Sequence, residues 1–207
     1  MGPAAMSLIT FVTVAHGMPD SLRTCLSSLI EQTERDIDVI VVDNTQIMEV
    51  AVRNKELCLM DQRIRYEWVA DRTNISYQNF RHKHCLYTAT EIGVSLATGD
   101  WLCFPNQDSY YVPVFADRIL SIATRDSLEF VYCNLVLGTP YQHYRPLDCQ
   151  PCCRAIDKTN FIMKREWFTG FQHKWAHYDI ADGLMVDDLV ARGIQHGKIN
   201  EYLVVHN

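Results

Sequence analysis

The sequence has no long apolar run. Of its 207 residues, 48% are hydrophobic, but no stretch approaches the roughly 20 consecutive apolar residues that a membrane-spanning helix needs. The N-terminus also lacks a charged segment followed by a cleavable apolar one, as a secretory leader would have. We therefore expect a cytoplasmic protein in a reducing compartment, with peripheral attachment to a membrane left open.

An excess of positive charge is missing as well. The chain has 19 Lys and Arg against 25 Asp and Glu, which gives a formal net charge of −6. Because a nucleic-acid surface needs clustered Lys and Arg, we expect no nucleic-acid partner. Internal repeats, low-complexity tracts and linkers are absent too, and the length favours one domain over residues 1–207.

The eight cysteines do not have the pattern of a disulfide-rich scaffold. Five of them are scattered through apolar segments, where a thiol behaves as a small hydrophobe. Cys149, Cys152 and Cys153 in "DCQPCCR" are more typical of a metal cluster. However, no second Cys-x-x-Cys pair follows, and a structural zinc site normally has four ligands. Free thiols are the preferred interpretation, and the role of these three residues stays open.

Strand and helix signals alternate along the first half of the chain. Apolar, β-branched runs predict strands, and apolar residues at helical spacing predict helices. The expected strands are 7–15, 37–44, 63–70 and 101–104, separated by helices at 19–32, 49–59 and 80–97. This order is typical of an α/β protein with a mostly parallel sheet flanked by helices. The less regular second half predicts a strand at 129–137, a helix at 182–192 and a strand at 198–207.

Polar residues follow each of the four strands in the first half. The segments are "AHG", "DNTQ", "DRTN" and "NQDS". In parallel sheets, ligands bind outside the carboxyl ends of the strands, so these four ends predict one shared site. For "NQDS" an ordinary turn is the alternative, because Asn, Asp and Ser favour turns.

Three blocks of the sequence resemble the family 2 glycosyltransferases of the GT-A fold, in that family's order. They are "SLITFVTVAHGMPDSLRTCLSSLIEQTERDIDVIVVDNTQ", "ATEIGVSLATGDWLCFPNQDSYYVP" and "IADGLMVDDLVARGIQHGKINEYLVVHN". In that family, the first block is a strand–helix–strand unit ending in "VVDN", and the second is a helix and a strand ending in Asp-x-Asp. Its last block is an acidic helix before a strand that ends in His-Asn. The stretch 136–177 resembles the family little.

The resemblance implies both a fold and a reaction. The fold is a single GT-A-like, Rossmann-like domain, with about 7–110 binding the nucleotide and about 111–207 serving the acceptor and catalysis. The reaction moves a sugar from a nucleotide sugar, expected to be UDP-linked, to an acceptor hydroxyl with inversion, assisted by Mn²⁺ or Mg²⁺. The acceptor is a glycan, a lipid-linked molecule or a small molecule. The small size indicates an enzyme that works with partners or as a homo-oligomer.

By the same resemblance, Asp108 and His206 are the expected metal ligands. Asp108 lies where the family has the last acid of its Asp-x-Asp motif, and His206 lies where many members have a third ligand. Divalent cations such as Mg²⁺ and Mn²⁺ prefer oxygen ligands, and imidazole also suits Mn²⁺. Asn106 replaces the family's first acid, which predicts weak metal affinity without nucleotide. For His206 the alternative is a solvated chain end.

Asp182 is the expected catalytic base. It lies in "DIADGLMVDDLVARG" together with Asp187 and Asp188, for which a solvated helix face near Arg192 is the preferred interpretation. A base must reach the acceptor hydroxyl from the side opposite the leaving group. For Asp182 the alternative is the N-cap of a helix.

The remaining expected site residues contact the nucleotide. They lie at the four strand ends and comprise Ala15, His16, Gly17, Asp43, Asp71, Arg72, Asn74, Asn106 and Gln107. In the resemblance, Asp43 is the acid that binds uracil or ribose. Arg72 offers a cation to a phosphate.

Two other functions remain open at this point. The first is a binding module that keeps the nucleotide pocket and has lost turnover, which Asn106 favours, whereas Asp108, Asp182 and His206 together favour an enzyme. The second is a nucleotidyltransferase. It would need a phosphate loop rich in Gly, Lys and Arg after the first strand, and "AHGMPDS" is not one.

Overall fold

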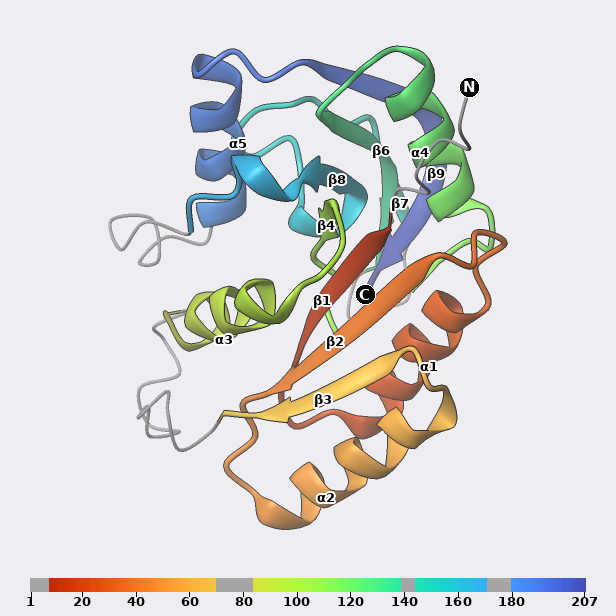
Figure 1. Ribbon diagram of the computed structural model, residues 1–207, viewed down its shortest axis with the longest axis vertical. Helices are drawn as coiled ribbons and strands as arrows, with labels where there is room; N and C mark the ends of the chain where they lie inside the picture. Colours follow the sequence, from red (N-terminus) through yellow and green to blue (C-terminus); the bar gives the residue numbers. More distant parts are fainter. Residues whose placement is uncertain (1–7, 70–83, 139–143, 171–179) are drawn as a thin grey trace.

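The computed structural model describes residues 8–69, 84–138, 144–170 and 180–207 (Figure 1). Within these ranges, nine strands form one sheet in the order β3-β2-β1-β4-β8-β6-β9-β5, and β7 pairs with β6. The predicted α/β architecture with flanking helices is confirmed.

The first half has the predicted alternation of strands and helices. Its elements are β1 (Ile9–Ala15), α1 (Pro19–Ile30), β2 (Ile37–Asp43), α2 (Met48–Leu57), β3 (Ile64–Trp68), α3 (His84–Leu96) and β4 (Trp101–Cys103). All four strands pair in parallel, with β1 between β2 and β4. The helices α1 and α2 cover one face of this part of the sheet and α3 covers the other (Figure 1). Among the described residues, no helix is long and apolar enough to cross a membrane.

The elements of the second half are β5 (Ser109–Tyr111), α4 (Phe115–Arg125), β6 (Phe130–Leu137), β7 (Arg145–Leu147), β8 (Phe161–Lys164), α5 (Ala181–Ala191) and β9 (His196–His206). Four of them, namely β5, α4, β7 and β8, have no counterpart among the predicted strands and helices. The missed helix α4 buries Phe115, Ile119 and Ala123, which recur at helical spacing. The missed strand β8 has only four residues, too few to show a period. Because β8 pairs antiparallel with β4 and β6, the parallel first half continues into a mixed sheet.

The described residues also include short 3-10 helices. They are η1 (Cys58–Met60), η3 (Lys158–Asn160) and η4 (Arg165–Trp167). Of these, η3 begins with a capping box. The Asp157 carboxylate accepts a hydrogen bond from the Thr159 N–H at 2.9 Å, and the Asn160 side-chain oxygen accepts one from the Asp157 N–H at 3.1 Å. Such reciprocal bonds fix the first turn of a helix.

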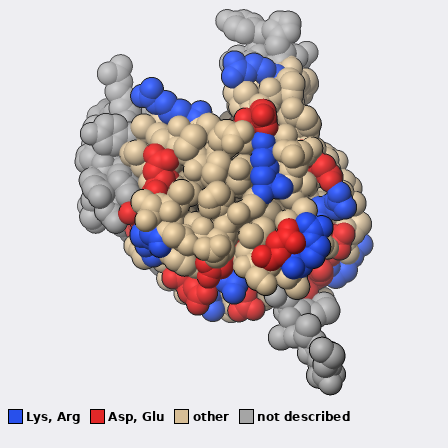
Figure 2. All heavy atoms as spheres, turned by 90° about the horizontal axis from the view of Figure 1, so that it is seen from above, with Lys and Arg blue, Asp and Glu red and all other residues tan. Residues whose placement is uncertain are grey.

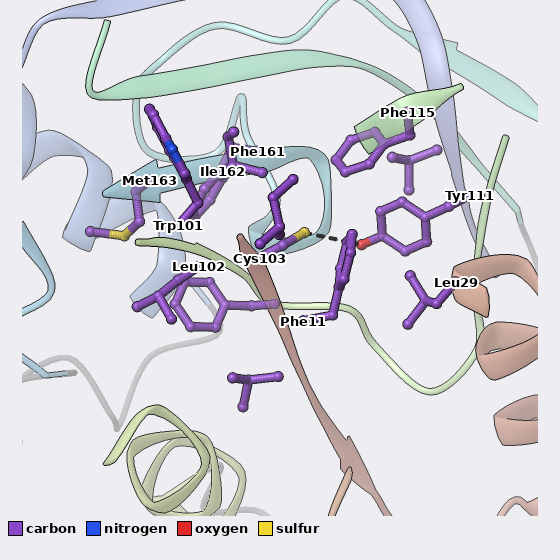
Figure 3. Packing of buried hydrophobic residues seen from close by; sticks show 14 of the residues in the cluster. Phe11, Leu29, Trp101, Leu102, Cys103, Tyr111, Phe115, Phe161, Ile162 and Met163 are labelled. Atoms are coloured by element: carbon purple, nitrogen blue, oxygen red, sulfur yellow. Dashed lines mark hydrogen bonds between the residues drawn. The ribbon is translucent and has the colours of Figure 1, made fainter. Parts of the chain in front are cut away.

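Aromatic side chains from three elements meet in the core (Figure 3). The Phe11 ring of β1 and the Tyr111 ring of β5 lie edge to face at 5.9 Å, and Tyr111 meets Phe115 of α4 in the same way at 4.8 Å. The Tyr111 hydroxyl donates a hydrogen bond to the Thr159 carbonyl at 2.7 Å. The core therefore joins β1, β5 and α4 to η3.

A glycine allows α3 to pack closely on the sheet. A Cβ at Gly93 would lie 2.3 Å from Cγ1 of Val12 and 2.9 Å from Cγ2 of Val42. Both distances are far shorter than van der Waals contact between carbon atoms. Because only glycine fits at this position, α3 can lie directly against β1 and β2.

Charges of both signs share the face seen in Figure 2, where Lys and Arg side chains lie beside Asp and Glu. Ion pairs at the surface include Arg118 with Glu201 and Arg125 with Asp126. Exposed pairs of this kind contribute little to stability. On the face seen in Figure 2, charges of both signs are interspersed among the described residues, and no broad area of these residues has a single sign.

Replacing the buried hydroxyl of Tyr111 should destabilise the fold. In Tyr111→Phe the buried Thr159 carbonyl loses its phenol donor, which we expect to lower the free energy of unfolding by about 1–3 kcal/mol. The matched control is Tyr110→Phe, because Tyr110 is 37% exposed on the same strand. Urea denaturation of both variants measures the difference, and equal stabilities would contradict a role of this bond in anchoring η3.

Candidate functional site

The carboxyl ends of β1, β2 and β4 meet at one edge of the sheet. Ala15 at the end of β1 pairs with Asp43 at the end of β2, and Val14 forms an isolated bridge with Asn106 just after β4. Three expected nucleotide contacts lie outside the described residues, namely Asp71, Arg72 and Asn74. The structure therefore brings Ala15, Asp43 and Asn106 together.

Gln107 joins two of these strand ends through its side chain. The His16 N–H donates to the Gln107 Oε1 at 2.7 Å, and the Gln107 Nε2 donates to the His16 carbonyl at 2.9 Å. The next residue, Gly17, has φ of 73°, and its N–H donates to the Thr45 hydroxyl at 3.2 Å. Burial lowers the pKa of His16, against a smaller opposing effect of Asp43. Direct contacts of His16, Gly17 and Gln107 with a nucleotide stay predictions.

Asp43 is fully buried and organises the end of β2. Its Oδ1 accepts a hydrogen bond from the Thr45 N–H at 2.8 Å. Its Oδ2 accepts bonds from the Asn54 amide at 3.0 Å and from the Tyr66 hydroxyl at 2.8 Å. Burial, and then this hydrogen bond, raise the pKa of Tyr66. The predicted contact of Asp43 with uracil or ribose is compatible with the position at the shared edge and stays a prediction.

The two expected metal ligands lie side by side. His206 on β9 is the register partner of Ser109 on β5, which places its imidazole next to Asp108. Nε2 of His206 is 3.7 Å from Oδ1 of Asp108 and 3.0 Å from the side-chain nitrogen of Asn106. Burial raises the pKa of Asp108, and the nearby His206 opposes this rise. The side chain of Asn207 donates to the Asp108 carbonyl at 3.0 Å and fixes the chain end.

Asp157 is a member of the site that the sequence analysis missed. Its Oδ2 lies 3.2 Å from Nδ1 of His206, on the opposite side of the imidazole from Asp108. The contact is short but out of line for a hydrogen bond, so we treat it as an ion pair. Burial would raise the pKa of Asp157, but His206 and the Thr159 N–H hold it at about 2. In turn, Asp157 and then Asp108 raise the pKa of His206 against the effect of burial. The capping-box pattern in "DKTN" is the sequence signal by which Asp157 could have been found.

Asp182 lies in the first turn of α5. The N-cap of this helix is Ile180, so Asp182 is not the cap. Its Oδ2 accepts a hydrogen bond from the Lys158 N–H at 3.1 Å, and its Oδ1 accepts one from the Gly183 N–H at 2.9 Å. Burial, and then the negative charge of Asp157, raise the pKa of Asp182. A raised pKa makes a carboxylate a stronger base once it is ionised.

Lys158 adds a positive charge to this group of acids. Burial lowers the pKa of Lys158, while Asp157, Asp182 and Asp108 counteract this effect. Its charge in turn lowers the pKa values of Asp108 and Asp182. Lys158 falls in the stretch that resembles the family little, and its sequence context gave no signal.

The other two acids of α5 have structural contacts. Asp188 forms the expected ion pair with Arg192 at 3.3 Å, four residues further along the helix. Asp187 accepts a hydrogen bond from the Cys153 N–H at 2.9 Å and so anchors the preceding loop to α5. Asp187 is exposed and Asp188 half-buried, so the interpretation as a solvated helix face fits both, and Asp187 in addition holds the loop.

Seven of the cysteines are free thiols in the structure. Cys149 is buried, Cys153 is partly buried and Cys152 is exposed. Within the described ranges, no group of three or more His, Cys, Asp and Glu is arranged to hold a metal ion. Burial raises the pKa of Cys149, as expected for an inert structural thiol.

The arrangement of the strands and helices is that of a GT-A glycosyltransferase fold. Fragment 1-349 of S. aureus TarS matches with a TM-score of 0.72 and 9% identity, covering 96% of this chain and 60% of that one. The mannosyltransferase PcManGT from Pyrobaculum calidifontis, in complex with GDP-Man and Mn²⁺, matches with a TM-score of 0.71 and 12% identity, covering 96% of this chain and 56% of that one. At these identities the likeness shows the fold alone.

The sequence identifies the family. The model for glycosyl transferase family 2 matches residues 10–178, and the chain belongs to this family. The putative glycosyltransferase EpsH of Bacillus subtilis (strain 168) is 25% identical over 126 residues, which cover 61% of this chain and 33% of that protein. The chain thus spans about a third of the length of this curated relative.

The ion pairs of His206 should make stability depend on pH. Because the pKa of His206 is raised above 6.5 in the folded state, the protonated ring stabilises the fold below pH 6.5. This contribution disappears as the pH rises through the folded pKa. The stability difference between wild type and His206→Asn should therefore shrink over that interval.

Urea denaturation from pH 5.5 to 9 measures this difference. The control is His196→Asn, at the exposed start of the same strand, which removes an imidazole that takes no part in these ion pairs. A difference between wild type and His206→Asn that is constant with pH would contradict the ion pairs.

Proposed function

We propose that this chain transfers a sugar from a nucleotide sugar, UDP-linked, to an acceptor hydroxyl with inversion and with the help of Mn²⁺ or Mg²⁺. The observation that carries the proposal is the convergence of Asp108 and His206 at the sheet edge. Asp182 is joined to the same group through the backbone of Lys158. Membership of glycosyl transferase family 2 supports the reaction class.

The residues present fit a divalent cation with two protein ligands. The 3.7 Å between His206 Nε2 and Asp108 Oδ1 is less than twice the ligand distance of about 2.1 Å for Mg²⁺, so both atoms can reach one ion. Mg²⁺ commonly uses one or two carboxylates together with substrate phosphates. When bound, such an ion stabilises the negative charge on the departing nucleoside diphosphate. The Mn²⁺ in PcManGT supports this assignment by likeness of fold.

Asp182 is proposed as the general base. Its carboxylate is held by the N–H groups of Lys158 and Gly183, so it is oriented before the acceptor arrives. Burial and Asp157 raise its pKa, which strengthens it as an acceptor of the proton from the attacking hydroxyl. Attack from the face opposite the leaving diphosphate inverts the anomeric carbon.

The nucleotide is proposed to lie along the ends of β1, β2 and β4. Ala15, His16 and Gly17 would line one wall, with Asp43 and Asn106 beside them. A UDP-linked donor is supported by TarS, which has been solved with UDP and with UDP-GlcNAc. PcManGT binds GDP-Man, so GDP is the alternative nucleotide.

The second candidate function is a nucleotide-binding module without turnover. Asn106 favours it, because an amide brings no charge to a metal and its nitrogen already contacts His206 at 3.0 Å. The presence of a half-buried Asp182, whose pKa is raised by desolvation and by Asp157, favours the enzyme.

Metal-dependent nucleotide binding tests the role of Asp108. We expect UDP to bind more tightly with Mn²⁺ than without it, and Asp108→Asn to weaken the binding with Mn²⁺ about tenfold or more, or roughly 1.4 kcal/mol. Without Mn²⁺, the same substitution should have little effect. Calorimetric titration with UDP and GDP gives all these affinities. Binding of UDP that is indifferent to both Mn²⁺ and Asp108 would refute the metal assignment, and no binding of either nucleotide would refute the transferase.

Turnover tests the role of Asp182. Loss of a general base typically costs 10² to 10⁴ in rate, so Asp182→Asn should lower kcat by about that factor and leave UDP affinity unchanged. The measurement is UDP release from a panel of UDP-sugars, with mixed acceptors. Asp188→Asn, on the same helix but in an exposed ion pair, is the control and should retain activity. Equal rates in the two variants would exclude Asp182 as the base.

A further inference from the structure

Asp157 lies between the proposed metal ligand and the proposed base. We infer that Asp157 is a positioning residue that orients His206 toward the metal, and that η3, which it caps, fixes the spacing between His206 and Asp182. The inference rests on the proposed function. It concerns a residue in the stretch that resembles the family least.

The two oxygens of the Asp157 carboxylate make different contacts. Oδ1 accepts the Thr159 N–H at 2.9 Å and thereby caps η3. Oδ2 lies 3.2 Å from Nδ1 of His206. A cap alone would use one oxygen and leave the other for water, so the second contact points to a further role.

The element that carries Asp157 is anchored in the core. Tyr111, whose ring packs on Phe11 and Phe115 (Figure 3), donates its hydroxyl proton to the Thr159 carbonyl at 2.7 Å. The side chain of Asn160 donates to the Cys133 carbonyl, and the Cys133 thiol donates to the Asn160 carbonyl at 3.5 Å. A carboxylate on so fixed a support has little freedom to move away from His206.

The geometry at His206 is that of an oriented metal ligand. With Nδ1 facing Asp157, the other ring nitrogen faces Asn106 at 3.0 Å and Asp108 at 3.7 Å. A carboxylate that holds one ring nitrogen fixes the tautomer and directs the lone pair of the other toward a metal. Hydrogen bonds in catalytic sites are often poorly aligned in the free enzyme and tighten as the reaction complex forms. The poorly aligned contact between Asp157 and His206 is consistent with this behaviour.

The same short helix also holds the base. The residue after Asp157 donates its backbone N–H to Oδ2 of Asp182 at 3.1 Å. Two adjacent residues, Asp157 and Lys158, therefore fix the metal ligand on one side and the base on the other. A shift of η3 would move both groups relative to the substrate.

The test compares Asp157→Asn with a matched control. Asparagine can still cap η3 through its side-chain oxygen, so the variant removes mainly the charge that faces His206. Asp148→Asn is the control, because Asp148 is also an acid that pairs with β9, through Lys198, away from His206. Electron paramagnetic resonance of Mn²⁺ in the presence of UDP gives the metal affinity. Thermal unfolding and UDP binding without metal give the integrity of each variant.

We expect Asp157→Asn to lose about 10- to 100-fold in Mn²⁺ affinity and Asp148→Asn to keep the wild-type value. UDP affinity without metal should be the same in all three proteins. Equal Mn²⁺ affinity in wild type and Asp157→Asn would show that Asp157 is only a helix cap. If wild type binds UDP but no Mn²⁺, the inference is overturned while a metal-independent transferase stands.

A second measurement needs neither metal nor substrate. Long-range proton–nitrogen NMR at a pH above the folded pKa of His206 reports which ring nitrogen carries the proton. We expect the proton on Nδ1 in wild type and a shift toward Nε2 in Asp157→Asn. A wild-type ring with its proton on Nε2 would overturn the inference even if both variants fold poorly.

Discussion

The candidate site depends on the register of one strand. β9 pairs in parallel with β6 and antiparallel with β5, and His206 is opposite Leu137 on one side and Ser109 on the other. The register between β6 and β9 shifts on either side of Asn134, ahead of the pairing of Leu137 with His206. Because side chains alternate between the faces of a sheet, a slip of one residue would turn His206 away from Asp108. The irregular pairing is thus what brings the end of the chain into the site.

The second constraint is the balance of charge around that histidine. Asp108, Asp157 and Asp182 form a group of acids with His206 and Lys158 as its cations. Carboxylates so close to one another cannot all ionise equally, and their pKa values move apart. The ion pair with His206 lowers the pKa of Asp157, whereas burial and the charge of Asp157 raise that of Asp182. One acid is thereby kept as a fixed counter-ion and another becomes a stronger base.

The sequence was informative where function follows from local pattern. The parallel strands of the first half could be predicted because apolar runs mark them. The family resemblance put Asp108 and His206 in one site, and the structure has them 3.7 Å apart. Their role as metal ligands stays a prediction. Asp157 could not be placed, since its role depends on His206, on a strand about 50 residues later in the chain. Lys158 could not be placed either, since its backbone contacts Asp182 on a helix 24 residues later. The part played by Gln107 was hidden for a similar reason: its amide bonds the backbone of His16, 91 residues away in sequence.

Two amides, Asn106 and Gln107, follow β4 where acids might be expected, and a different contact explains each of them. Gln107 must donate to a carbonyl and accept from an N–H of the same residue, which an amide can do and a carboxylate cannot. Asn106 contacts Nε2 of His206, where an acid would add a third negative charge around one imidazole, beside Asp108 and Asp157. The neutral amide leaves the site with less charge to attract a cation on its own. In the proposed reaction, the donor diphosphate supplies that missing charge, so metal and nucleotide would bind together rather than in turn.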